Sequence, residues 1–145
     1  MKTEQQPTSG LQNIARVILG AFMFLAGLGH LTFQRLEFQA QVPTWIPISA
    51  DLTVVLSGIV EISLGLALIF WRKKRIRTGI LLAIFFVLVF PGNISQYTEQ
   101  RDAFGLDTDS KRLARLFFQP VLILWALWSS GALQNWFKKN EELED

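Results

Sequence analysis

The stretch LTVVLSGIVEISLGLALIFW, residues 52–71, decides the fold class of this chain. It contains one ionisable residue, Glu61, and the later stretch at residues 78–97 contains none. A surface helix of a water-soluble bundle needs a polar face, which neither stretch can provide. Twenty residues at about 1.5 Å each span roughly 30 Å, the thickness of the hydrocarbon core of a bilayer. The sequence therefore predicts helices that cross a membrane.

Apolar segments on either side of these two complete a four-helix pattern. Half of the 145 residues are hydrophobic and 18% are charged, whereas about a quarter of a soluble domain is usually charged. We predict an all-α polytopic membrane protein, an antiparallel bundle of four transmembrane helices. This single domain covers residues 11–137, with helices at about 11–33, 52–71, 78–97 and 113–137. Residues 1–10 are predicted to form a flexible N-terminal tail, and residues 138–145 a polar C-terminal tail.

The connections between the predicted helices differ in kind. The segment 34–50 contains Pro43 and Pro47, which forbid a regular helix through it. Asp51 follows this segment and is expected to be the N-cap of the second helix. The basic residues at 72–77 form a tight turn, so the second and third helices are predicted to be an antiparallel pair.

Lysine and arginine residues set the predicted orientation. If both chain ends and the loop at 72–77 are cytoplasmic, nine of these residues lie inside and five lie outside. We therefore predict a multi-pass protein of the plasma or inner membrane with cytoplasmic N- and C-termini. The basic loop is interpreted as a topology signal, so no nucleic-acid partner is expected. The bilayer itself is the predicted partner.

Several kinds of chemistry are excluded by composition. The chain has no cysteine, which removes disulfides, thiol redox relays, thiolate metal ligands and iron–sulfur clusters. A single histidine, His30, argues against a haem held by two histidines of the same chain. No metal site is predicted.

Glu61 lies close to the middle of its predicted helix. A charged group at the bilayer centre costs about 2.5–3.5 kcal/mol on insertion scales, so its presence calls for a reason. Ser57, Gly58 and Gly65 share the helix face of Glu61, and small residues allow a second helix to approach closely. We therefore expect the Glu61 side chain to point into the bundle.

Polar residues of the other three helices fall in the outer half of the membrane. They are His30, Asn93, Gln96, Arg115 and Gln119. Pro91 and Pro120 are expected to kink their helices and to free the carbonyls of Val87 and Leu116. We predict a polar pocket between the helices that opens outward and has Glu61 as its floor.

Structural explanations compete with this prediction. Glu61 could form a buried pair with Arg115 or His30 that only fixes helix register. Arg115 could extend to the headgroups, and the three amides could link helices without binding anything. The sequence leaves these alternatives open, as it does the presence of any catalytic activity and of a homo-oligomer.

Five motifs together carry a resemblance to a known family. They are GLGH at 27–30, VPTWIP at 42–47, SGIVEISLGLAL at 57–68, FPGNI at 90–94 and RLFFQPVLILWALW at 115–128. In this order and spacing they resemble the DoxX-like family of small four-helix membrane proteins. The resemblance covers most of the chain, from the first predicted helix to the fourth.

The resemblance implies the four-helix fold and gives importance to His30, Glu61, Pro91, Asn93 and Gln119. Members of that family include subunits associated with quinone-linked oxidoreductases. The expected function is an accessory or ligand-binding subunit in membrane redox chemistry, with a quinone or another lipophilic molecule as ligand and a membrane or peripheral redox partner. The alternatives are a structural membrane protein whose polar core fixes packing, and a small membrane enzyme that acts on a lipophilic substrate.

Overall fold

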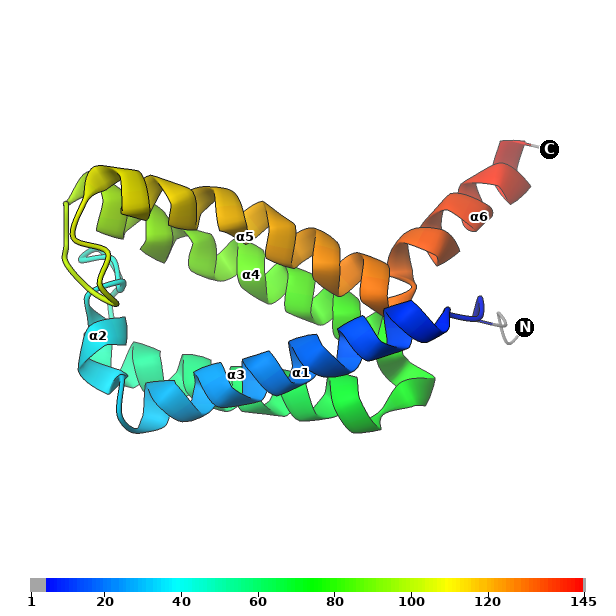
Figure 1. Ribbon diagram of the computed structural model, residues 1–145, viewed down its shortest axis with the longest axis horizontal. Helices are drawn as coiled ribbons and strands as arrows, with labels where there is room; N and C mark the ends of the chain where they lie inside the picture. Colours follow the sequence, from blue (N-terminus) through cyan, green and yellow to red (C-terminus); the bar gives the residue numbers. More distant parts are fainter. Residues whose placement is uncertain (1–4, 145) are drawn as a thin grey trace.

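The computed structural model describes residues 5–144 and is 79% helical, with no strand among these residues. Its elements, in chain order, are α1 (Gly10–Leu31), α2 (Arg35–Gln39), α3 (Ala50–Phe70), the 3-10 turn η1 (Arg72–Lys74), α4 (Arg75–Thr98), α5 (Asp109–Ser130) and α6 (Ala132–Glu144) (Figure 1). The four helices α1, α3, α4 and α5 are long and apolar enough to cross a membrane. The predicted all-α bundle of four transmembrane helices is thus confirmed.

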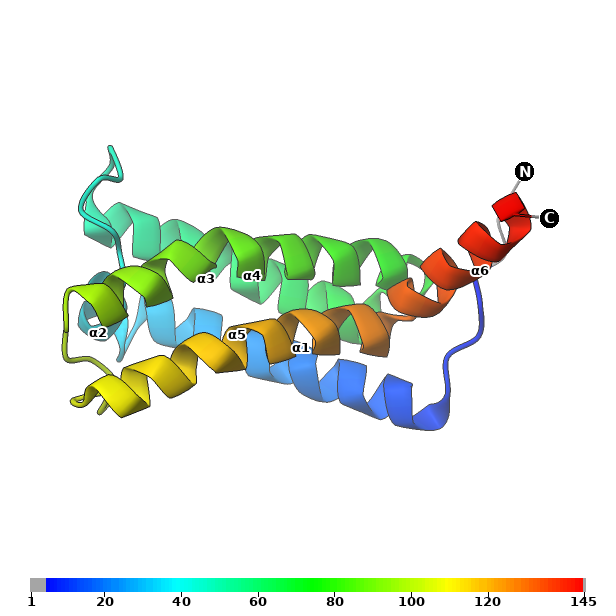
Figure 2. The same ribbon diagram turned by 90° about the horizontal axis from the view of Figure 1, so that it is seen from above.

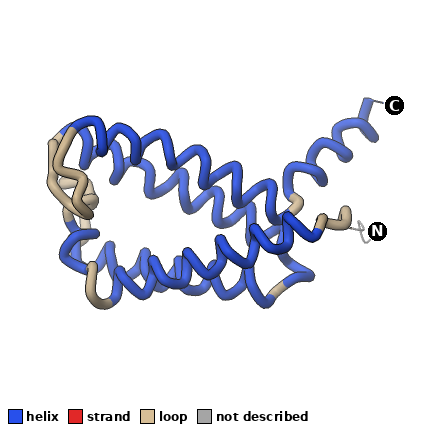
Figure 3. The backbone as a smooth tube through the Cα atoms, viewed as in Figure 1, coloured by secondary structure: helices blue, strands red, loops and turns tan. Residues whose placement is uncertain are grey.

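The bundle consists of two helix pairs. α1 packs mainly against α3, and α4 packs mainly against α5. The pairs meet at the end of the molecule that carries η1, which we call the basic end, and they part toward the other end (Figure 1). The chain starts and finishes at the basic end, as both views show (Figures 1 and 2). At the other end α2 and residues 40–49 link α1 to α3, the loop at residues 99–108 links α4 to α5, and these segments contact each other (Figure 3). We call these three segments the cap.

Glycines bring α1 and α3 into close contact. A Cβ atom at Gly27 would lie 2.6 Å from the carbonyl oxygen of Gly58, and one at Gly65 would lie 2.6 Å from the carbonyl oxygen of Gly20. The two glycines of each helix are seven residues apart, so both pairs lie on one seam of this antiparallel contact. Side chains at these positions would force the two backbones apart.

The hydrophobic core fills the half of the bundle near the basic end. All four spanning helices contribute to it, through residues that include Leu19, Leu68, Leu82 and Leu122. Two side chains reach across from one helix pair to the other in this half. Trp125 donates its indole N–H to the carbonyl of Ala15 at 3.0 Å, and Gln12 donates to the carbonyl of Trp128 at 2.9 Å. In this half the helices of the two pairs are therefore in direct contact.

The start of α3 differs from the prediction. Ser49 is its N-cap, because the Ser49 hydroxyl accepts a hydrogen bond from the N–H of Leu52. Asp51 lies in the first turn of α3 and accepts two hydrogen bonds from Arg35, at 2.6 and 2.5 Å. Arg35 belongs to α2, a short helix that forms before Pro43, in the part of the predicted loop that holds no proline.

The two ends of the chain also differ from the prediction. The fourth spanning helix ends at Ser130 rather than near Phe137, because Gly131 takes a left-handed conformation with φ of 83°. The predicted polar C-terminal tail at 138–145 is helical as far as Glu144, as part of α6. Of the predicted N-terminal tail, residues 1–4 lie outside the described residues, and Gln5 bonds to the turn after α3.

Candidate functional site

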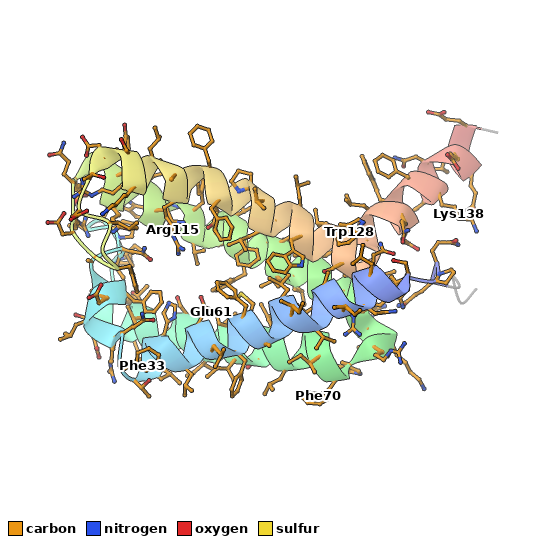
Figure 4. The ribbon with its side chains drawn as sticks, in the orientation of Figure 1. Phe33, Glu61, Phe70, Arg115, Trp128 and Lys138 are labelled. Atoms are coloured by element: carbon orange, nitrogen blue, oxygen red, sulfur yellow. The ribbon has the colours of Figure 1, made fainter. Side chains whose placement is uncertain are left out.

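A cavity of about 810 Å³ lies between the two helix pairs, in the half of the bundle next to the cap. Glu61 of α3 and Arg115 of α5 face it from opposite layers (Figure 4). Its walls are mostly apolar and contain several phenylalanines, from α1, α2, α4 and the loop after α4. The predicted site residues that line it are His30, Glu61, Pro91, Asn93, Arg115 and Gln119.

Glu61 and His30 are in contact although they come from different helices. Each is 7% exposed. The Nδ1 atom of His30 lies 3.0 Å from Oε2 of Glu61 and 2.9 Å from the carbonyl oxygen of Ala26, one turn earlier in α1. A single N–H cannot serve both acceptors well, and its geometry favours the carbonyl. The Oε2 atom of Glu61 is therefore buried without a hydrogen-bond partner.

Arg115 provides a second incomplete polar group on the opposite wall. Its Nε atom is buried and has no hydrogen-bond partner among residues 5–144. Within the same residues no carboxylate lies within ion-pair distance of Arg115, so the pair of Arg115 and Glu61 that the sequence left open does not form. Buried charged groups without partners are costly. The cavity is therefore lined by a carboxylate, which accepts hydrogen bonds, and by a guanidinium group, which donates them, and neither group has all of its partners within residues 5–144.

Asn93 and Gln119 form a complete polar link between α4 and α5. Asn93 is 5% exposed and Gln119 is 3% exposed. The Asn93 amide donates to Oε1 of Gln119 at 3.0 Å, and the Gln119 amide donates to the carbonyl of Phe86 at 2.7 Å. Pro91 was expected to free the carbonyl of Val87, but the carbonyl that accepts from Gln119 is that of Phe86, one residue earlier. α4 and α5 both continue as helices through Pro91 and Pro120. These two amides hold the wall of the cavity in place.

Gln96 lies in the last turns of α4, bonds to the cap and does not line the cavity. It is 1% exposed. Its amide nitrogen donates to the carbonyls of Arg101 and Ala103 at 3.3 and 3.5 Å, and its Oε1 accepts from Gln41 at 2.9 Å. Gln96 thus joins the end of α4 to both segments that pass over the cavity.

Arg101 is the main connector of the cap, and no sequence pattern singles it out. Its guanidinium donates to the carbonyls of Ala40 and Val42 at 2.8 and 3.0 Å and to the Ser95 hydroxyl at 2.9 Å. It also pairs with Glu99. A charge-assisted bond to a carbonyl is stronger than a neutral one. Arg101 therefore fastens the segment after α2 to the end of α4.

Two aromatic rings of the cap cover His30. The rings of His30 and Phe38 are stacked, with centroids 3.3 Å apart and planes at 17°. Phe38 in turn meets Phe104 edge to face at 4.6 Å. Phe38 lies in α2, which was predicted to be part of a loop; the absence of proline and glycine from residues 35–40 is the signal that could have revealed the helix.

The cap lies across the end toward which the sequence predicted an opening. Two cavity-lining residues of the spanning helices are instead well exposed on the outer surface of the bundle, Leu25 at 61% and Leu88 at 70%. Apolar side chains that are exposed on spanning helices are of the kind that faces lipid tails in a bilayer.

The pair of Glu99 and Arg101 gives the cap a pH dependence. Hydrogen bonds from Arg101 and from Ser95 hold the pKa of Glu99 below its ordinary value of 4.5. Since the folded pKa is the lower one, this stabilisation is present above about pH 4.5 and is lost as the pH falls through the folded value. We expect hydrogen exchange in the loop at 99–108, corrected for intrinsic rates, to rise below pH 4.5 in the wild type. An equal rise in Glu99→Gln would contradict this assignment.

Comparison with known proteins places the chain in a family. Among the described residues no group of three or more His, Cys, Asp and Glu side chains could hold a metal ion. No curated protein and no solved structure matches the chain. Residues 19–130 match the profile of a family described as a domain of unknown function, DUF8561. The matched segment contains the cavity and the cap, and it ends with α5. Because the match covers more than half of the residues, this chain belongs to the DUF8561 family.

Proposed function

We propose that this protein binds a lipophilic small molecule with a polar head group in the cavity between its two helix pairs. The observation that carries the proposal is the presence of an unpaired carboxylate oxygen on Glu61 and an unpaired guanidinium nitrogen on Arg115, on facing walls of one largely apolar cavity. Small-molecule sites commonly combine apolar walls with a few polar groups that fix the orientation of the ligand.

A quinone or its reduced form is the ligand class that this arrangement favours. A ring carbonyl oxygen of a quinone can accept a hydrogen bond from the guanidinium group of Arg115, and the hydroxyl of a quinol can donate one to the carboxylate of Glu61. The phenylalanine side chains around the cavity, with Phe38 and Phe104 toward the cap, can hold the ring and the start of an isoprenoid tail. The exposed Leu25 and Leu88 give the tail a route into the bilayer.

The resemblance to the DoxX-like family supports a role in membrane redox chemistry. We accordingly propose an accessory or ligand-binding subunit that works with a membrane or peripheral redox partner. The basic end carries η1, Lys138 and Lys139, so by the positive-inside rule we place it and both termini on the cytoplasmic side of the inner membrane.

Mass spectrometry of co-purifying small molecules tests this proposal. The wild type is expected to retain a quinone or a related lipophilic molecule. Glu61→Gln keeps the shape but removes the charge that accepts the bond, so retention is expected to fall about tenfold or more. Glu142→Gln makes the same chemical change on the exposed α6 and should retain the molecule as the wild type does.

Two results would contradict the proposal. If the wild type retains no small molecule after mild extraction from the native membrane, the cavity has no ligand. If the wild type, Glu61→Gln and Arg115→Gln retain the molecule equally, these two polar residues do not hold it and serve only helix packing.

Acid–base catalysis is a second candidate, and the contact between His30 and Glu61 favours it. The sequence suggested that these residues lie at different depths, but their side chains are 3.0 Å apart, close enough to exchange a proton. We expect His30→Gln to distinguish the two functions. An enzyme that loses its base accumulates unconverted substrate of a different mass from the molecule on the wild type, whereas a binding protein retains the same molecule.

A further inference from the structure

A second recess lies far from the cavity, at the basic end of the bundle. It is a groove of about 450 Å³ between the start of α1 and the end of α3. Asn13, Arg16 and Arg72 supply its polar part, and its apolar part includes Val17, Ile18 and Ile69. Val17 and Ile18 are 40% and 53% exposed. The groove thus runs from basic side chains onto a surface suited to lipid tails.

Arg16 is the residue that makes this groove unusual. It is 2% exposed although it carries a charge. One of its terminal nitrogens donates to the carbonyl of Leu68, and to that of Ile69 at 3.4 Å. Arg16 therefore caps the last turn of α3, where the helix dipole favours a cation. Its Nε atom has no hydrogen-bond partner among the described residues.

Within the part of the chain that the structure describes, positive charge gathers around Arg16 without a matching carboxylate. Arg72 and Arg75 are close enough to act on it electrostatically. Within residues 5–144 no Asp or Glu lies within ion-pair distance of any of these three arginines. Cations of like sign repel each other, and an anion beside them offsets that repulsion. An anionic group at the exposed Arg72 is therefore favoured electrostatically.

We infer that this groove binds the phosphate of an anionic phospholipid, with an acyl chain lying along Val17, Ile18 and Ile69. The exposed guanidinium of Arg72 can bind phosphate oxygens through paired N–H donors, Asn13 can add a neutral donor, and the buried charge of Arg16 adds electrostatic attraction. The groove lies where a lipid headgroup meets the first turns of spanning helices, and the leaflet that faces the cytoplasm is the one rich in anionic lipid. This inference does not depend on a ligand in the cavity.

Native mass spectrometry of the whole protein in detergent, with added lipid, tests the site. Dioleoyl phosphatidylglycerol and dioleoyl phosphatidylcholine have the same chains but differ in charge. We expect the wild type to retain one phosphatidylglycerol about fivefold more strongly than phosphatidylcholine, because an arginine near the surface contributes about 1 kcal/mol to anionic lipid binding. Arg72→Gln is expected to remove that preference; Arg72 is exposed, so the variant should fold.

Lys73→Gln is the matched control. It removes the same charge from the same turn, but Lys73 does not line the groove. At 0.15 M salt, where charges farther away than about 8 Å are screened, it should lower phosphatidylglycerol binding less than about twofold. Equal losses in Arg72→Gln and Lys73→Gln would mean that the attraction is diffuse, and the inferred site would be wrong.

Inorganic phosphate separates a lipid site from a phosphate site. If the acyl chain is part of recognition, inorganic phosphate at about 10 mM, far above the lipid concentration, should not displace bound phosphatidylglycerol. Full displacement would show a site for free phosphate and would overturn the assignment to a lipid.

Discussion

Replacing Gly65 with leucine is expected to push α1 away from α3 and to destabilise the protein by about 3 kcal/mol or more. A Cβ atom at this position would lie 2.6 Å from the carbonyl oxygen of Gly20 and 2.8 Å from the backbone nitrogen of Phe24. Both atoms belong to the main chain of α1, so neither can turn aside as a flexible side chain could. The remaining atoms of leucine would add to the clash.

Thermal unfolding in detergent, followed by circular dichroism, measures this effect. A loss of 3 kcal/mol corresponds to a fall in the melting temperature on the order of 10 °C for a chain of this length. Ser63→Leu is the matched control, because Ser63 is exposed on the outer face of the same helix and its hydroxyl bonds only within α3. If Gly65→Leu melts within about 1 °C of Ser63→Leu, the described contact of α1 with α3 is incorrect.

Removal of the Arg101 side chain is expected to have the second-largest effect, confined to the cap. Arg101→Ala removes the bonds to the carbonyls of Ala40 and Val42 and the contacts with Ser95 and Glu99. Charge-assisted hydrogen bonds contribute about 1.5–3 kcal/mol each. Even a part of this sum is large against the stability of a short segment, so the cap should open often.

Hydrogen exchange of peptides that cover residues 35–44 and 99–108 measures cap opening. We expect exchange there to accelerate about tenfold or more in Arg101→Ala, which corresponds to about 1.4 kcal/mol, while the spanning helices stay protected. Lys138→Ala removes an exposed cation that pairs with Glu142 within α6, far from the cap, and should leave both peptides unchanged. Unchanged exchange in Arg101→Ala would mean that other contacts hold the cap.

The sequence predicted the spanning helices because their apolar runs are long and almost free of charge. The inward position of Glu61 was likewise predictable from Gly58 and Gly65 on its face. The structure explains its burial by the close approach of α1 to these glycines. The contact of Glu61 with His30 was not predictable, because it depends on the register between two antiparallel helices. Gly58 sets that register: a Cβ atom there would lie 2.8 Å from Cβ of His30.

Local signals misled where a distant contact decides the outcome. Ser49 and Asp51 are both good N-cap residues, and Asp51 is taken from that role by Arg35, sixteen positions away in sequence. At the other end, Leu133, Trp136 and Phe137 continue the apolar pattern of α5 beyond Gly131. Only the left-handed backbone of that glycine shows that a new helix begins. The cap was missed because its contacts join segments that no sequence pattern links.

The junction of the two helix pairs has a geometric consequence. Each helix pair is about as long as α1, whose 22 residues extend roughly 33 Å, and the two pairs touch chiefly near Trp125 and Ala15. One extra methyl group at this contact would therefore tend to separate the far ends of the two pairs by a multiple of its own size, and the hydrogen bonds of Arg101 and Gln96 in and beside the cap would oppose that separation. The width of the cavity thus depends on residues that do not line it.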